Sequence, residues 1–169
     1  IDLGYQLFFQ PMVTKNYTDD DFLALITRAN QLNIHAFYVV DSFGSMTLDE
    51  FQHYISLAHG HLNPSIVLGY HSHNNMQLAF SNAIDLCISS IDREVILDSS
   101  IYGMGRGAGN LNTELIIDYL NTTSKYKYEV MPLLEVIDEI LTYYFKKKSW
   151  GFSPTQYLSA SLDCHPNYA

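Results

Sequence analysis

Two histidines separated by a single residue are the side chains of this sequence best suited to hold a metal ion. His71 and His73 follow Ile66–Tyr70, an apolar run with the composition of a β-strand. Residues two apart in a strand point to the same face, so the two imidazoles should project side by side at the strand end. Imidazole is a common ligand of divalent metals. The pair predicts half of a metal coordination sphere; the competing interpretation is two ordinary polar residues at a strand end.

A second histidine pair with the same spacing provides an internal comparison. His59 and His61 follow the helical pattern of residues 51–57 and precede Asn63-Pro64. We interpret this pair as a helix stop followed by a surface turn, and expect no metal role for it.

Four strand-like runs, each followed by a helical pattern, must position these side chains. The expected strands are residues 5–9, 36–40, 66–70 and 94–98, and the expected helices are 22–32, one opened by a Thr47–Glu50 capping box, 76–89 and 113–121. Successive strand–loop–helix units require an α/β fold with a parallel sheet and right-handed crossovers. Polar segments follow the strands at their C-terminal ends, where α/β enzymes place their chemistry. Both an open doubly wound sheet and part of an eight-stranded barrel fit this pattern.

The glycine-rich segment Gly103–Asn110 follows the fourth expected strand. Its first six residues have the spacing of a dinucleotide-binding fingerprint ending in alanine. That fingerprint belongs after the first strand of a βαβ unit, so we reject this interpretation. Alternating glycines instead let the backbone approach a ligand closely, and Asn110 could turn its amide oxygen toward the strand ends. A tight connection with Asn110 or Asn112 as a helix cap is the alternative.

Composition and charge narrow the class of protein. The chain has 169 residues, 47% of them hydrophobic, which suffices for one domain, and its net charge of −9 argues against a nucleic-acid surface. The basic cluster Lys146–Lys148 ends a helical run, where cations complement the helix dipole. Two cysteines make no disulfide framework and no apolar run could span a membrane, so we expect a cytoplasmic protein. The chain starts at Ile1 without a signal-like segment, and we expect it to be a piece of something longer.

From residue 128 onward the alternation of strands and helices stops. Apolar residues recur at helical spacing over 133–145, a pattern typical of a core or a subunit-packing face. The aromatic, turn-rich segment 150–159 and the polar segment 164–168 could each fold back over the site. We therefore divide the chain into residues 1–124 and a helical C-terminal extension, residues 125–169.

Three motifs, in order and in separation, resemble one known family. Val39–Gly44, Gly69–Asn75 and Gly103–Asn110 are similar to segments of the metal-dependent aldolases and lyases built on (β/α)8 barrels, which include 4-hydroxy-2-oxovalerate aldolases and hydroxymethylglutaryl-coenzyme A lyases. The resemblance covers about Gly4 to Leu120. It implies that residues 1–124 are the C-terminal half of a TIM barrel, strands five to eight.

The resemblance also implies a ligand set. It makes His71 and His73 metal ligands, with Asn110 completing the set in some members, and Mn²⁺ or Mg²⁺ the expected ion rather than Zn²⁺. The family's first strand carries an Asp ligand followed by an Arg and an acidic residue, and the first strand-like run of this sequence, residues 5–9, carries no such triplet. We therefore expect the missing N-terminal half of the barrel as a partner and no turnover by this chain alone. Self-association is another way to cover its open edge strands.

The activity implied is retro-aldol cleavage of a 4-hydroxy-2-oxoacid substrate through a metal-stabilised enolate. Tyr157 resembles a tyrosine that reaches back over the site as an acid or base, although the gap before it is shifted, and a packed tyrosine is the alternative. Arg106 would contact an anionic substrate group or remain a solvated loop residue. Asp41 would orient a ligand or a bound water, or simply cap the loop after its strand.

Two further functions remain open at this point. Within the same family, an acyl-coenzyme A lyase or a Claisen-condensing synthase that uses acetyl-coenzyme A shares the barrel motifs. From a different class, the chain could be a metal-free interaction or structural module in which the histidines only pack. Metal content separates this last alternative from an enzyme.

Overall fold

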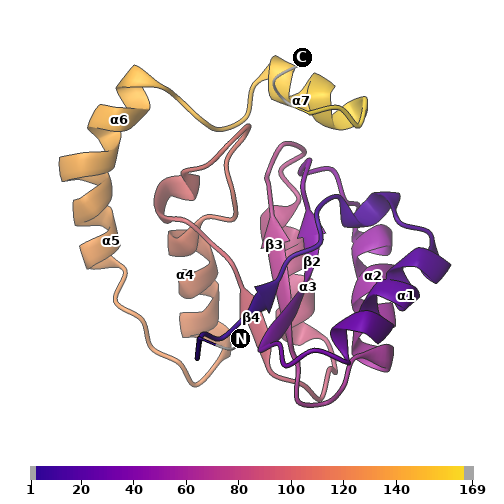
Figure 1. Cartoon of the computed structure of the whole chain (residues 1–169). Coiled ribbons are helices and arrows are strands. Elements are labelled where there is room, and N and C mark those ends of the chain that lie inside the picture. Colours follow the sequence, from indigo (N-terminus) through magenta and orange to yellow (C-terminus); the bar gives the residue numbers. More distant parts are fainter. Residues whose placement is uncertain (1–2, 166–169) are drawn as a thin grey trace.

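A four-stranded parallel sheet forms the centre of the chain. The computed structural model describes residues 3–165. Its strands lie in sequence order: β1 (Phe8–Phe9), β2 (Ala36–Asp41), β3 (Val67–Ser72) and β4 (Val95–Leu97). The connecting helices are α1 (Asp19–Ala29), α2 (Leu48–His61), α3 (Ala79–Ile88) and α4 (Thr113–Thr123), as Figure 1 shows. The predicted α/β fold of four strand–helix units is confirmed.

Side-chain caps begin α1 and α2, and the cap of α2 is the predicted one. Thr18 accepts a hydrogen bond from the Asp21 N–H at the start of α1. Thr47 and Glu50 form both hydrogen bonds of a capping box at the start of α2. The main core lies between these helices and one face of the sheet, where β2 and β3 contribute Phe37, Val39, Leu68 and Tyr70. A smaller cluster on the opposite face contains Ala36, Tyr38, Val40 and Val67.

Several boundaries differ from the sequence expectation. The first strand is limited to two residues, whereas β3 continues through His71 and Ser72 because they pair with Val40 and Asp41 of β2. The second histidine pair ends α2, as predicted, but it lies within the last helical turn rather than in a surface turn. The helix includes His59 and His61, since the buried side chains of Ala58 and Leu62 hold its last turn against the core.

The C-terminal part is helical, as predicted. A continuous helical segment consists of α5 (Met131–Val136), a π-helical turn (η3, Ile137–Leu141) and α6 (Thr142–Lys147). Of the predicted apolar stripe, only Leu141 is buried, so within this chain the stripe is not core. The last helix, α7 (Pro154–Ser161), lies beyond the C-terminal ends of β2 and β3 (Figure 1). Among residues 3–165, no helix is long and apolar enough to cross a lipid bilayer.

Candidate active site

His71 lies on β3 with one ring nitrogen already engaged. Its Nδ1 atom is 3.1 Å from Oδ2 of Asp98, the residue that follows β4. The Asp98 N–H donates to the Tyr70 carbonyl, which extends the β3–β4 pairing to this point. A carboxylate on one imidazole nitrogen fixes the ring and its tautomer, and leaves the other nitrogen for a ligand bond. His71 is thus oriented as metal-binding histidines usually are.

Asp98 accepts two further hydrogen bonds. The Tyr38 hydroxyl donates to Oδ1 at 3.0 Å, and the Gln10 amide donates to Oδ2 at 3.1 Å. Burial by itself raises the pKa of Asp98, but the hydrogen bonds from His71, Tyr38 and Gln10 outweigh it and leave the pKa below its usual value. Burial, with the Asp98 charge, raises the pKa of Tyr38, so this hydroxyl keeps its proton. The carboxylate therefore stays ionised beside His71.

Sequence reasoning missed this group, although one signal for it was available. Asp98 ends a strand-like run, as Asp41 does, and polar residues at the C-terminal ends of strands indicate site residues in an α/β fold. Tyr38 carried no such signal because it lies in a wholly buried strand. Its place depends on Gly69, its partner on β3, where an added Cβ would lie 2.5 Å from the tyrosine ring. Glycine at that position lets the ring cross the sheet toward Asp98.

His73 lies beyond β3, beside His71. The two ring centroids are 5.5 Å apart and the rings are perpendicular. The His73 N–H donates to the Asp41 carbonyl at 3.0 Å, and its Nε2 atom is 3.3 Å from a guanidinium nitrogen of Arg106. Burial, together with the charges of Arg106 and His71, lowers the pKa of His73 to about 4. His73 is therefore neutral at neutral pH, the form in which imidazole binds metals.

Asn110 adds an oxygen to the two imidazoles. It pairs with His73 in an isolated antiparallel bridge, and it lines a cavity of about 350 Å³ together with His71 and Asp98. Its Oδ1 atom is buried and has no hydrogen-bond partner among the described residues. An unpaired buried acceptor is costly unless a ligand or ion satisfies it. The donor set of two imidazoles and one amide oxygen fits part of a divalent-metal site.

Carboxylate ligands do not complete that set. Within the part of the chain that the structure describes, no group of three or more His, Cys, Asp or Glu residues is arranged to hold a metal ion. As far as the structure describes the chain, the donors at this strand end are the two imidazoles and the Asn110 oxygen.

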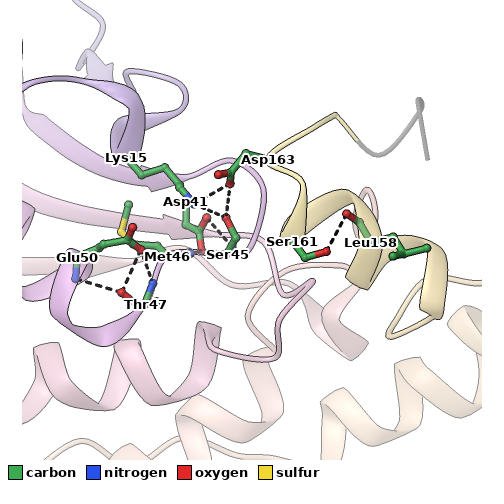
Figure 2. Close-up of polar contacts among 9 residues, drawn as sticks. All are labelled: Lys15, Asp41, Ser45, Met46, Thr47, Glu50, Leu158, Ser161 and Asp163. Carbon is green, nitrogen blue, oxygen red and sulfur yellow. Dashed lines mark hydrogen bonds and ion pairs between the residues drawn. The ribbon is translucent and has the colours of Figure 1, made fainter.

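Asp41 acts on the loop that follows its own strand. Its buried carboxylate accepts hydrogen bonds from the Ser45 and Met46 N–H groups, both at 3.0 Å, as Figure 2 shows. Burial raises the pKa of Asp41, and these backbone hydrogen bonds oppose the shift. The carboxylate thus caps the loop, one of the two roles expected for it. Its contact with the histidine pair runs through the main chain, from its carbonyl to His73.

Arg106 and the C-terminal segment meet next to His73. The Arg106 guanidinium also lies 3.3 Å from the Ser42 carbonyl and 3.0 Å from Nε2 of His165. It is exposed to solvent and at the same time hydrogen-bonded to the loops.

The C-terminal segment also contacts two other loops. The buried Asn75 amide donates to the Gln156 carbonyl and the Ser159 hydroxyl, both at 3.2 Å. At the far end of α7, Asp163 pairs with Lys15 at 2.7 Å, a contact visible in Figure 2. The tail does fold back over the strand ends, as one sequence interpretation held.

Tyr157 is the predicted site residue that the structure does not bring to the histidines. It lies on α7 with 45% of its surface exposed, and among the described residues its hydroxyl makes no hydrogen bond. Its role in the site stays a prediction.

The chain is similar in sequence to one known family and to several named proteins. The HMGL-like family matches residues 2–138. The chain is 28% identical over 114 residues to oxaloacetate decarboxylase of Mycobacterium tuberculosis, which covers 68% of this chain and 32% of that protein. It is 36% identical over 80 residues to 4-hydroxy-2-oxovalerate aldolase of Pseudomonas putida, which covers 47% and 22%. The matched part thus spans between about a fifth and a third of these relatives.

Two solved structures share the fold. The N-terminal domain of a candidate aldolase from Bacteroides vulgatus superposes with a TM-score of 0.84 at 27% identity, over 99% of this chain and 54% of that one. Hydroxymethylglutaryl-CoA lyase from Pseudomonas aeruginosa superposes with a TM-score of 0.65 at 18% identity, over 92% and 53%. The parallel sheet is consistent with part of a TIM barrel. With its sequence matched over residues 2–138, the chain belongs to the HMGL-like family.

Proposed function

We propose that this chain is part of a divalent-metal-dependent lyase that cleaves a 4-hydroxy-2-oxoacid by a retro-aldol reaction. The observation that carries the proposal is the placement of His71, His73 and the unpaired Asn110 oxygen around one strand end. The names of the relatives from M. tuberculosis and P. putida support the substrate class, because oxaloacetate and 4-hydroxy-2-oxovalerate are both 2-oxoacids whose carbon–carbon bonds are cleaved.

The proposal assigns the chain to one half of a barrel. Residues 1–124 would supply strands five to eight, and residues 125–169 would form an extension after the barrel. Another half would pair with the edges that β1 and β4 leave open, and would bring the carboxylate that this donor set lacks. The arrangement is supported by the share of relatives and neighbours that the chain spans.

The proposal assigns a role to each site residue. His71, His73 and Asn110 would hold Mn²⁺ or Mg²⁺, which when bound supplies positive charge for the oxygen that becomes negative as the bond breaks. Asp98 would keep His71 in the tautomer that carries its proton on Nδ1, which leaves the lone pair of Nε2 for the metal. Arg106, already beside His73, would contact the substrate carboxylate. Tyr157 would act as acid or base only after α7 turns it toward the histidines.

Calorimetric titration of Mn²⁺, with Mg²⁺ and Zn²⁺ for comparison, tests the metal site. We expect the chain to bind Mn²⁺ and His71→Ala/His73→Ala to lose that binding. His59→Ala/His61→Ala is the matched control, because this pair has the same spacing and lies at the end of α2. Equal loss in the two double variants, or no binding by the full-length parent protein, would contradict the proposal.

Turnover is tested separately. We expect this chain with Mn²⁺ to release no pyruvate from 4-hydroxy-2-oxovalerate, since part of the ligand set is absent, whereas the full-length parent should release it. Pyruvate release by the chain alone, abolished in His71→Ala/His73→Ala, would overturn the assignment to half a site.

A further inference from the structure

A second cavity is lined by part of the glycine-rich segment, residues 104–107. It has a volume of about 540 Å³ and lies between residues 104–107 and the end of α6, with walls that include Tyr144, Lys147, Lys148, Trp150 and Gln156. The Trp150 indole donates to the Tyr102 carbonyl at 2.7 Å and packs edge-on against Phe145. These contacts fix the wall of the cavity to the glycine-rich segment.

The charge of this cavity is opposite to that of the protein. The chain carries 18 acidic and 9 basic residues, yet Arg106, Lys147 and Lys148 line the cavity and none of its lining residues is acidic. Among the described residues, no ion pair neutralises Lys147 or Lys148. The Lys147 ammonium lies 4.1 Å from the centre of the Tyr143 ring, a cation–π contact that a negatively charged ligand could replace. The α6 dipole accounts for lysines at the end of the helix, but it does not explain why two of them line a cavity without acidic residues.

Gln156 adds an unsatisfied polar group. Its Oε1 atom is buried and has no hydrogen-bond partner among the described residues. The side-chain amide can turn about its last torsion to present either its oxygen or its NH₂ group. Turned so that its NH₂ group faces the cavity, the amide would donate to the oxygens of a ligand beside the three cations.

Arg106 connects this cavity to the candidate metal site. It lines the cavity, and one of its guanidinium nitrogens lies 3.3 Å from Nε2 of His73. A substrate whose 2-oxoacid end lies at the histidines could therefore extend past Arg106 into the cavity. The cations there would recognise a negative group at its far end.

We infer that this cavity binds the distal anionic group of the substrate, a carboxylate or a phosphate, and so favours oxoacids that are charged at both ends over 4-hydroxy-2-oxovalerate, which is charged at one end. The inference rests on the proposed function for the reacting end of the substrate, but the anion site stands on its own residues. It deepens the proposed function by narrowing the substrate class.

The single tryptophan of the chain lines the cavity and reports its occupancy. Inorganic phosphate and succinate, each titrated at constant ionic strength, should change the Trp150 fluorescence saturably. We expect Lys147→Gln/Lys148→Gln to weaken this binding about ten-fold, as lost charge-assisted hydrogen bonds do. Lys125→Gln/Lys127→Gln, on the connection between α4 and α5, changes the charge equally and should weaken it less than about two-fold.

The relative response to the two probes assigns the distal group as phosphate or carboxylate. No saturable change with either probe, or equal weakening in both lysine variants, would overturn the inference, because the effect would then be one of net charge. Mn²⁺ titration separates the two proposals. In Lys147→Gln/Lys148→Gln, Mn²⁺ binding should persist while anion binding weakens. In the unmodified sequence, anion binding by a full-length parent that binds no Mn²⁺ would leave the cavity as an anion site and refute the metal proposal, while Mn²⁺ binding without anion binding would do the reverse.

Discussion

Oδ2 of Asp98 lies 3.1 Å from Nδ1 of His71, so the end of β4 holds a ring that projects from β3. Tyr38 and Gln10 bind the same carboxylate, and the orientation of His71 therefore depends on three other segments of the chain.

Replacing that carboxylate should weaken metal binding without removing a ligand. Asp98→Asn keeps the size of the side chain but loses the charge that favours one tautomer of His71. We expect Mn²⁺ affinity to fall by about 10- to 100-fold in calorimetric titration. Asp92→Asn, at an exposed position before β4, is the control and should bind as the unmodified chain does. Unchanged affinity in Asp98→Asn would mean that the carboxylate does not position the histidine.

Acid should destabilise the protein through His73. Its pKa is about 4 in the folded chain and about 6.5 in an unfolded one. Between these values the unfolded chain binds a proton that the folded chain does not, so stability falls as the pH is lowered from about 6.5 to 4. From pH 7 to pH 5 we expect a loss of about 1–2 kcal/mol after allowing for partial exposure.

Urea unfolding at the two pH values measures this loss. In His73→Gln the difference between pH 7 and pH 5 should shrink by that amount. His61→Gln, at the exposed end of α2, controls for the removal of a histidine as such. An unchanged difference in His73→Gln would assign the acid sensitivity to other groups.

Gly44 packs closely against the backbone of residues 73–75. Its φ is +61°, and an added Cβ would lie 2.8 Å from the His73 carbonyl carbon and closer still to the Asn75 nitrogen. Gly44→Ala should lower the free energy of unfolding by about 2 kcal/mol or more and displace His73. Gly60→Ala is the matched control, because Gly60 lies in α2 with no atom near its Cβ position, and it should raise stability by about 0.5–1 kcal/mol. Similar changes in the two variants, measured by urea unfolding, would contradict this account.

Asn75 joins three segments through its buried amide. It accepts a hydrogen bond from the Ala108 N–H at 3.0 Å and donates to Gln156 and Ser159 of α7. Asn75→Ala should cost about 2–4 kcal/mol, since it leaves buried partners unsatisfied. Hydrogen exchange in α7 should accelerate more than exchange in α2. Asn33→Ala, at an exposed position, should alter neither, and an unchanged rate in α7 of Asn75→Ala would show that other contacts hold the helix.

The sequence predicted the parts of this structure that depend on local pattern. Apolar runs located the four strands and capping residues located α1 and α2, because both signals act within a few positions. The same reasoning brought His71, His73 and Asn110 to one edge of the sheet.

Contacts between distant segments carried no comparable signal. Nothing local pairs Asp98 with Tyr38, or places Arg106 between His73 and His165. The helix stop at His59/His61 was predicted, but the pair lies inside the last turn of α2 because burial of Ala58 and Leu62 outweighs the local preference for a turn. The apolar stripe of α5 and α6 was detected correctly as a pattern, but a pattern does not say which surface covers it.

The ion pair between Lys15 and Asp163 joins positions 148 residues apart. During synthesis from the N-terminus, Lys15 and Ser45 emerge long before the tail that binds them. Closing so large a loop lowers the entropy of the chain by more than one surface contact offsets. Docking of the tail should therefore follow assembly of the sheet. A chain with its sheet assembled and its tail not yet docked would have its strands in place while Asn75 lacked its partners on α7. The polar groups around His73 would acquire their final partners only in the last step of folding.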